Sequence, residues 1–198
     1  MKKLIIPFVL ALGAALGATS CGNNVQGNDA TPVYLEVNIG GQGAALPLTK
    51  AVNDNAPLQL ASVILTNHPK NPSAAVSNYM DVVLEDYIVS WTRIDGGKTA
   101  SPTERFTAFG VTPVNGTSNL QNFVFMTPDA LQKPPLNRLF PFNGGIDPET
   151  NSTTIHQAMT VVFHGHTVSG QAVTSTPGVF SLFFIYQAPG TIRVRMDK

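Results

Sequence analysis

The chain has 198 residues, of which 43% are hydrophobic and only 12% are charged. This balance excludes intrinsic disorder, and the length suffices for one domain with a sizeable core. Lysine plus arginine equals aspartate plus glutamate at 12 each, and no cluster of basic residues is present, so the composition excludes a nucleic-acid partner.

The first 20 residues have the pattern of a signal peptide. Lys2 and Lys3 precede an apolar run over residues 4–16. As a helix this run would cover about 20 Å at about 1.5 Å per residue, too short for a hydrocarbon core of about 30 Å. Residues 1–20 are therefore interpreted as an export signal and not as a membrane span.

Small residues lead directly to the only cysteine of the chain, in a segment that reads GATSC over residues 17–21. This segment resembles the lipobox of bacterial lipoproteins. The resemblance implies diacylglycerol on the Cys21 sulfur, cleavage before Cys21 and anchoring in the cell envelope. Gly22 stands where some Gram-negative lipoproteins carry an aspartate that retains them at the inner membrane, which favours, in a Gram-negative host, an outer-membrane address on either face. Ala18 and Ser20 also suit ordinary signal peptidase, which would leave Cys21 unmodified.

A polar tether is expected between the cysteine and the folded part. Residues 21–31 are rich in glycine and asparagine and offer nothing to bury. From Cys21 to Pro32 the chain can extend at most about 35 Å, at about 3.3 Å per residue. A single domain, predicted over residues 32–198, would therefore lie close to the membrane.

Alternation of apolar and polar residues predicts the first strand of that domain, and an apolar run predicts the second. Val33–Ile39 alternates apolar with polar residues, as a half-buried strand does. A second apolar run covers 58–66, and the proline-containing segment 67–73 is expected to be a turn.

The longest strand pattern covers 80–93, and its apolar residues change phase. One parity holds Val82 and Leu84, and the other holds Tyr87, Val89 and Trp91. Because a strand has a strict period of two, the change of phase predicts an extra residue, that is, a bulge near Glu85 and Asp86. Asp95, Gly96 and Gly97 then predict a tight turn.

Further strands are expected over 105–111, 120–127, 154–168, 179–186 and 192–196. The segment 179–186 is nearly all apolar, which predicts a strand covered on both sides. Residues 128–148 contain five prolines and are predicted to be a long connection over one end of the core. The apolar residues of this connection are Leu131, Leu136, Leu139, Phe140 and Phe142.

About eight strands and no convincing helix predict an all-β fold, best described as an antiparallel β-sandwich with Greek-key or immunoglobulin-like wiring. Trp91, central in a strand, is similar to the buried tryptophan of immunoglobulin domains. The body has no cysteine pair of the kind those domains carry. A closed β-barrel is the alternative.

Three histidines share one face of the strand over 154–168, namely His156, His164 and His166. Paired imidazoles can begin a metal site. The opposite face of this strand is apolar, so we expect the histidines to face solvent. His156 lies about 27 Å from His164 along an extended strand. Since no third ligand is evident, the sequence predicts neither a metal site nor a cofactor.

Carboxylates gather near the expected bulge, at Asp81, Glu85 and Asp86, and two carboxylates held at a defined distance can hydrolyse glycosides. Acidic residues on an exposed strand face are ordinary, however, and the sequence contains no recognisable catalytic motif. The segment 143–147 could offer oxygens to calcium but lacks the dense acidic spacing of such sites, so it is interpreted as a turn. We therefore predict that the chain is not an enzyme.

The function predicted from these features is that of a lipid-anchored envelope protein whose β-sandwich is an interaction or structural module. Its expected partners are the membrane, through Cys21, and an envelope protein or glycan. The first alternative is a module that binds carbohydrate or a small ligand on exposed aromatic residues. The aromatic candidates are Phe140, Phe142, Phe180, Phe183, Phe184 and Tyr186. An enzyme is the second alternative.

Overall fold

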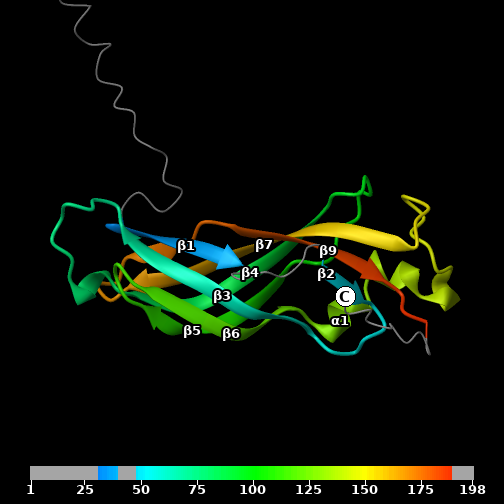
Figure 1. Cartoon of the computed structure of the whole chain (residues 1–198), viewed down its shortest axis with the longest axis horizontal. Helices are drawn as coiled ribbons and strands as arrows, with labels where there is room; N and C mark the ends of the chain where they lie inside the picture. The colour runs from blue at the N-terminus through cyan, green and yellow to red at the C-terminus, as the bar shows by residue number, and fades with distance from the viewer. Residues whose placement is uncertain (1–30, 40–47, 189–198) are drawn as a thin grey trace, which may run out of the picture.

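The computed structural model describes residues 31–39 and 48–188. The predicted signal peptide, Cys21 and the expected last strand over 192–196 lie outside the described residues. Within them the chain forms two β-sheets packed face to face (Figure 1).

The smaller sheet has three antiparallel strands in the order β1-β3-β6. They are β1 (Val33–Ile39), β3 (Leu58–Pro69) and β6 (Thr117–Met126). The strand predicted at 33–39 is thus found with the same bounds.

The larger sheet has six strands, five of them in the order β2-β9-β7-β4-β5, with β8 paired to β7. Every pairing in it is antiparallel except that of β2 with β9. The strands are β2 (Leu48–Ala51), β4 (Val82–Arg93), β5 (Glu104–Thr112), β7 (Thr154–Thr167), β8 (Ala172–Thr174) and β9 (Gly178–Ile185). Helical structure among the described residues is limited to α1 (Pro128–Leu131), η1 (Asn78–Met80), η2 (Leu136–Leu139) and η3 (Pro141–Asn143).

This arrangement confirms the predicted all-β sandwich. The order β9-β7-β4-β5 corresponds to strands G, F, C and C′ of a variable-type immunoglobulin sheet, and β1-β3-β6 corresponds to A, B and E of the opposite sheet. Trp91 lies on β4, the equivalent of strand C, and is 6% exposed. The described strands thus form two facing sheets, as in the predicted sandwich and unlike the closed-barrel alternative.

The core lies between the two sheets because one face of each strand is apolar. In β7 every second residue from Ile155 to Thr167 is buried. Phe163 on this face stacks on Tyr87 of β4, with ring centroids 5.2 Å apart. The Tyr87 hydroxyl donates to the Val124 carbonyl of β6 at 2.7 Å, which joins the two sheets, and burial raises the pKa of Tyr87 to about 12.

The predicted bulge in β4 is confirmed. Its register with both β5 and β7 shifts between Leu84 and Asp86. Against β7, Glu85 is the extra residue, whereas against β5 it faces two residues, Ala108 and Phe109. The bulge keeps Leu84 and Tyr87 on the buried face although they are three residues apart.

Two expectations were wrong in detail. Strand β9 is not covered on both sides, because its residues alternate and Val179 is 62% exposed. The turn expected from residue 67 begins later, since β3 continues to Pro69. Asn67 is fully buried inside that strand, where its side-chain amide satisfies the carbonyls of Met80 and Thr112. The short strands β2 and β8 were not predicted.

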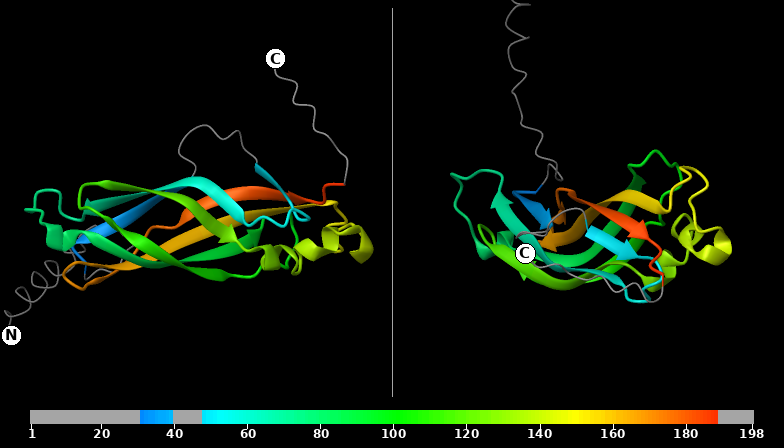
Figure 2. Two further views of the ribbon diagram at one scale, coloured as in Figure 1. Left: turned by 90° about the horizontal axis from the view of Figure 1, so that it is seen from below. Right: turned by 45° about the vertical axis from the view of Figure 1, so that its right-hand side comes forward.

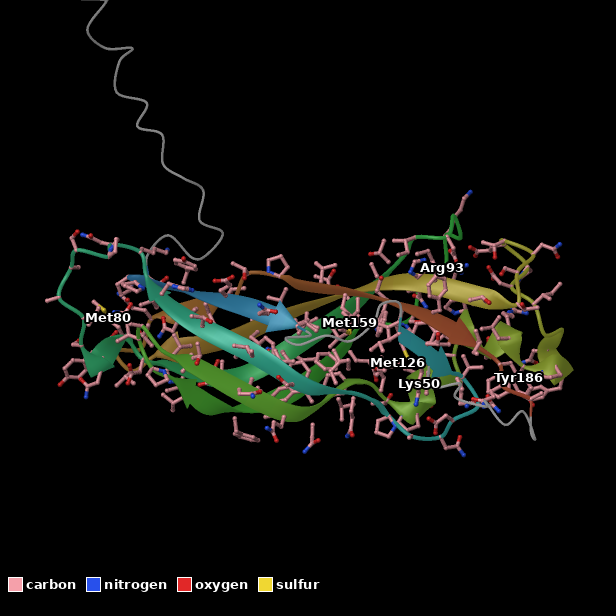
Figure 3. All side chains as sticks on the ribbon, in the orientation of Figure 1. Lys50, Met80, Arg93, Met126, Met159 and Tyr186 are labelled. Atoms are coloured by element: carbon pink, nitrogen blue, oxygen red, sulfur yellow. The ribbon has the colours of Figure 1, made fainter. Side chains whose placement is uncertain are left out.

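The molecule is elongated along its strands and has two distinct ends (Figures 1 and 2). At one, the proximal end, Pro32 leads into β1 beside the loops 70–81, 113–116 and 168–171. At the other, the crossover end, lie the turn 94–103 and the connection 127–153. Figure 3 shows Met80 at the proximal end and Arg93 toward the crossover end.

Candidate functional site

The connection between β6 and β7 forms a cap over the crossover end, as its prolines and leucines predicted. Leu131, Leu136 and Leu139 are fully buried. The cap begins at Thr127, whose hydroxyl accepts the Ala130 amide at 3.2 Å and donates to Glu104 of β5 at 2.6 Å. This long connection, which contains only the short helices α1, η2 and η3, is thus held by its own buried side chains.

A buried arginine fixes the cap to the larger sheet. The Arg93 guanidinium on β4 holds both carboxylate oxygens of Asp95, Nε to Oδ1 at 2.7 Å and Nη2 to Oδ2 at 2.9 Å. Nη2 also donates to Oδ2 of Asp147 in the cap at 2.7 Å, and Nη1 donates to the Thr99 carbonyl at 3.2 Å. The side chains of Arg93 and Asp147 are only 1% and 2% exposed.

The hydrogen bonds of this network outweigh the effect of burial on the pKa values of its two carboxylates. Burial acts to raise the pKa of Asp95, but the bonds from Arg93 and from the amides of His156 and Gly97 lower it to about 2. The pKa of Asp147 is also lowered, against the effect of burial, by Arg93 and Thr150. Arg93 and both carboxylates therefore stay charged at neutral pH.

The same end exposes large apolar side chains on this rigid base. Phe142, inside η3, is 80% exposed, whereas Phe140, the residue before η3, is buried. Ile94 and Ile146, next to the bonded Arg93 and Asp147, are 47% and 41% exposed. We call these three residues, Ile94, Phe142 and Ile146, the crossover residues.

A second cluster surrounds the β4 bulge on the outer face of the larger sheet, and it joins two groups that the sequence suggested separately. Nδ1 of His164 lies 2.9 Å from Oδ1 of Asp86, and Nδ1 of His166 lies 2.9 Å from Oε1 of Glu85. Arg105 of β5 donates to the other oxygen of Asp86. These five residues form the bulge cluster.

Both carboxylates of the bulge cluster have side-chain partners. The bond from Arg105 is the main cause of the lowered pKa of Asp86, and His164 adds to it against the effect of partial burial. Both carboxylates thus have cationic or imidazole partners, as in a structural ion-pair network. Within residues 31–39 and 48–188, no group of three or more histidine, cysteine or acidic side chains is placed to hold a metal ion.

The remaining predicted candidates lie apart from the cluster. The His156 ring stacks on Phe183 of β9 with centroids 3.9 Å apart. The Asp81 carboxylate accepts the Val114 amide at 2.9 Å and so shapes the β5–β6 turn. In the turn 143–147 the carboxylate of Asp147 accepts hydrogen bonds from Arg93 and Thr150.

Among the predicted aromatic residues, core packing accounts for Phe140, Phe180 and Phe184, whereas Phe142 is exposed. Sequence reasoning missed the Arg93 network. The sequence did contain a signal for this network. Arg93 follows Trp91 by two residues and so lies on the same buried face of β4, where a charge requires a partner.

No protein-family model and no curated protein matches the chain. A solved structure described as "X-ray structure of Northeast Structural Genomics Consortium target SoR45" is similar at 12% identity and a TM-score of 0.35, covering 84% of this chain and 95% of that one. In the described part of the chain, no helix has the length and apolar character needed to cross a membrane.

Proposed function

We propose that the protein is a lipid-anchored envelope protein that binds a protein partner through its crossover end. The anchor is supported by the signal-peptide pattern, the lipobox-like segment and the single cysteine at position 21. Two or more acyl chains hold a protein stably on a membrane, whereas one does not.

The observation that carries the interaction role is the exposure of Phe142 on a rigid base. An aromatic side chain that is 80% exposed gains about 1–2 kcal/mol or more when a partner covers it. Because the cap is already fixed by Arg93 and its buried leucines, little conformational entropy would be lost on binding. The cap also lies at the end of the sandwich opposite to the start of β1 (Figure 1), the strand that the expected tether precedes.

In-cell photocrosslinking tests this role. A photoreactive phenylalanine analogue would replace Phe142 in one strain and Phe109 in another. Phe109 lies on β5 and is 82% exposed, so it is matched in residue type and exposure. We expect a protein adduct from position 142 and none from position 109. Recovery of only the isolated protein from both strains would contradict the proposal.

The anchor has its own test. Intact-mass analysis of the protein from its native host should show cleavage before Cys21 and the added mass of the lipid. A bare N-terminal thiol would remove the membrane address and leave the proposed partner site unaffected.

Ligand binding at the bulge cluster is the second candidate function, and Phe109 favours it. The register places Ala108 and Phe109 opposite the bulge, between the pairs Leu84–Gly110 and Asp86–Thr107. An exposed aromatic ring beside carboxylate and guanidinium groups suits a small polar ligand such as a sugar. A thermal-shift panel of glycans and metal ions would test it, with Phe109→Ala as the variant and Phe142→Ala as the control. No shift with any compound would exclude this candidate.

A further inference from the structure

We infer that the proximal end rests on the lipid surface that carries the anchor, with Val76, Tyr79 and Val168 in the interface between headgroups and acyl chains. This inference rests on the proposed lipid anchor, and it adds an orientation: the long axis of the sandwich points away from the membrane.

The two ends differ in charge. The proximal loops 70–81, 113–116 and 168–171 contain only two charged residues, Lys70 and Asp81. The Asp81 carboxylate already accepts a backbone amide. The crossover end, over 94–103 and 127–153, contains seven, and five of them lie outside the Arg93 network: Lys98, Asp129, Lys133, Arg138 and Glu149. Since a charge is costly to move toward hydrocarbon, only the proximal end suits a lipid surface.

The exposed apolar residues of the proximal end come from two neighbouring loops. Tyr79 is 64% exposed, Val168 49% and Val76 44%. The Ser169 amide donates to the Tyr79 carbonyl at 3.1 Å, and the Val168 amide donates to the Asp81 carbonyl at 2.9 Å, so the two loops are joined. Tyrosine favours the membrane–water boundary because its ring is apolar and its hydroxyl can stay hydrated.

The point at which the chain joins the sandwich places these loops toward the anchor. The Pro32 carbonyl accepts the Lys70 amide at 2.8 Å, so β1 begins beside the loop that carries Val76 and Tyr79. A flexible tether of the expected length would have a mean end-to-end distance of about 18 Å. The 14 residues of β7 span about 45 Å at about 3.3 Å each. Such a tether is shorter than the sandwich and would keep the proximal end nearest the membrane.

The loops are also fixed before any lipid contact. Nδ2 of the buried Asn67 donates to the carbonyls of Met80 and Thr112, both at 3.0 Å. The backbone nitrogen of Asn67 donates to the Gly116 carbonyl at 3.0 Å, which holds the loop 113–116 as well. Docking would therefore require little ordering of the backbone.

Fluorescence quenching by brominated lipid tests the orientation. The mature chain beginning at Cys21 would be coupled through its single thiol to a maleimide phospholipid in phosphatidylcholine vesicles with brominated acyl chains. This coupling makes the test independent of acylation in the host. The reporters are Tyr79→Trp at the proximal end and Phe142→Trp at the crossover end. Trp91, 6% exposed, contributes the same background to both.

We expect quenching of the Tyr79→Trp variant to exceed that of the Phe142→Trp variant at least about threefold, with a shift of its emission to shorter wavelength. Val168→Trp is a second proximal reporter, in case the Tyr79 substitution disturbs folding. Equal quenching at both ends, or stronger quenching at Phe142→Trp, would overturn the inference. That result would leave the proposed lipid anchor in place, because the intact mass of the host protein tests the anchor separately.

Discussion

Nη2 of Arg93 on β4 lies 2.7 Å from Oδ2 of Asp147, which is 54 residues later in the chain. Both side chains are almost fully buried, and Asp95 accepts from Nε and from the same Nη2 of the guanidinium. Loss of one member of such a network leaves a buried charge without its partner, which costs more than the intact network contributes. The position of the cap therefore depends on this contact, and so does the position of the crossover residues, through which we propose that a partner binds.

Asp147→Asn is expected to lower the free energy of unfolding by about 1–3 kcal/mol, because it weakens a buried charge-assisted hydrogen bond to Arg93. Urea denaturation followed by the fluorescence of Trp91 would measure the change. Asp129→Asn in the same connection is the matched control. Asp129 pairs with Lys133 on the surface, where an ion pair contributes about 0.5 kcal/mol or less. Equal effects of the two substitutions would contradict the assigned role of Asp147.

Acid should weaken the protein through Asp95. Its pKa is about 2 in the folded protein against 3.8 for the ordinary side chain. As the pH falls below about 4, the unfolded chain takes up a proton that the folded chain does not. The associated stability, about 2 kcal/mol, is present above about pH 4 and is lost progressively as the pH falls toward about 2.

Urea titrations at about pH 5, 4 and 3 would measure this loss in the natural protein and in Asp95→Asn. At the highest of these pH values the variant should have a lower free energy of unfolding than the natural protein. As the pH falls, that free energy should decrease less in the variant. Parallel curves for the two proteins would show that another group is responsible.

The strand pattern of this chain was predictable because alternation leaves a direct record in the sequence. The change of phase between Leu84 and Tyr87 is enough to locate the bulge, which the register shift at Glu85 confirms. Likewise, the leucines and prolines of 128–148 predicted a packed connection. In each case a local rule about which face is buried was sufficient.

The candidate sites were harder to predict because they depend on which strands become neighbours. His164 and Asp86 both carried a signal, but only the pairing of β4 with β7 brings them to 2.9 Å. The short strand β2 was missed because its four residues pair in parallel with β9, and no alternation of useful length marks it. The burial of Asn67 was missed because its partners come from two distant segments.

Gly178→Ala should destabilise the sandwich, because β9 approaches β1 closely at this glycine. An added Cβ would lie 2.6 Å from Cγ1 of Val37 and 2.7 Å from Cδ1 of Ile39. Overpacking of this kind costs about 1–3 kcal/mol. Thermal denaturation would show it, with Ser181→Ala on the outer face of the same strand as a control expected to change stability by less than about 0.5 kcal/mol. An unchanged melting temperature for Gly178→Ala would mean that the sheets separate more easily than the packing indicates.

Asn67→Ala should loosen the proximal end. The substitution leaves the carbonyls of Met80 and Thr112 without their donor in a buried site, at a cost of about 1–3 kcal/mol. Hydrogen exchange should become faster at the amides of Met80, Asp81 and Val114. Asn119→Ala, on the exposed part of β6, is the control and should leave these amides protected. If these three amides stay protected from exchange in Asn67→Ala, the Asn67 side chain does not hold the proximal loops.

Strand β1 runs along the long axis of the sandwich and starts at the proximal end (Figure 1), and seven residue pairs join it to β3. Tension between an anchor at this end and a partner held at the crossover end would act along the strands. It would load the hydrogen bonds between β1 and β3 together, in shear, and would not break them one after another. The connection to the first strand would therefore resist mechanical load much better than a strand pulled sideways from its sheet.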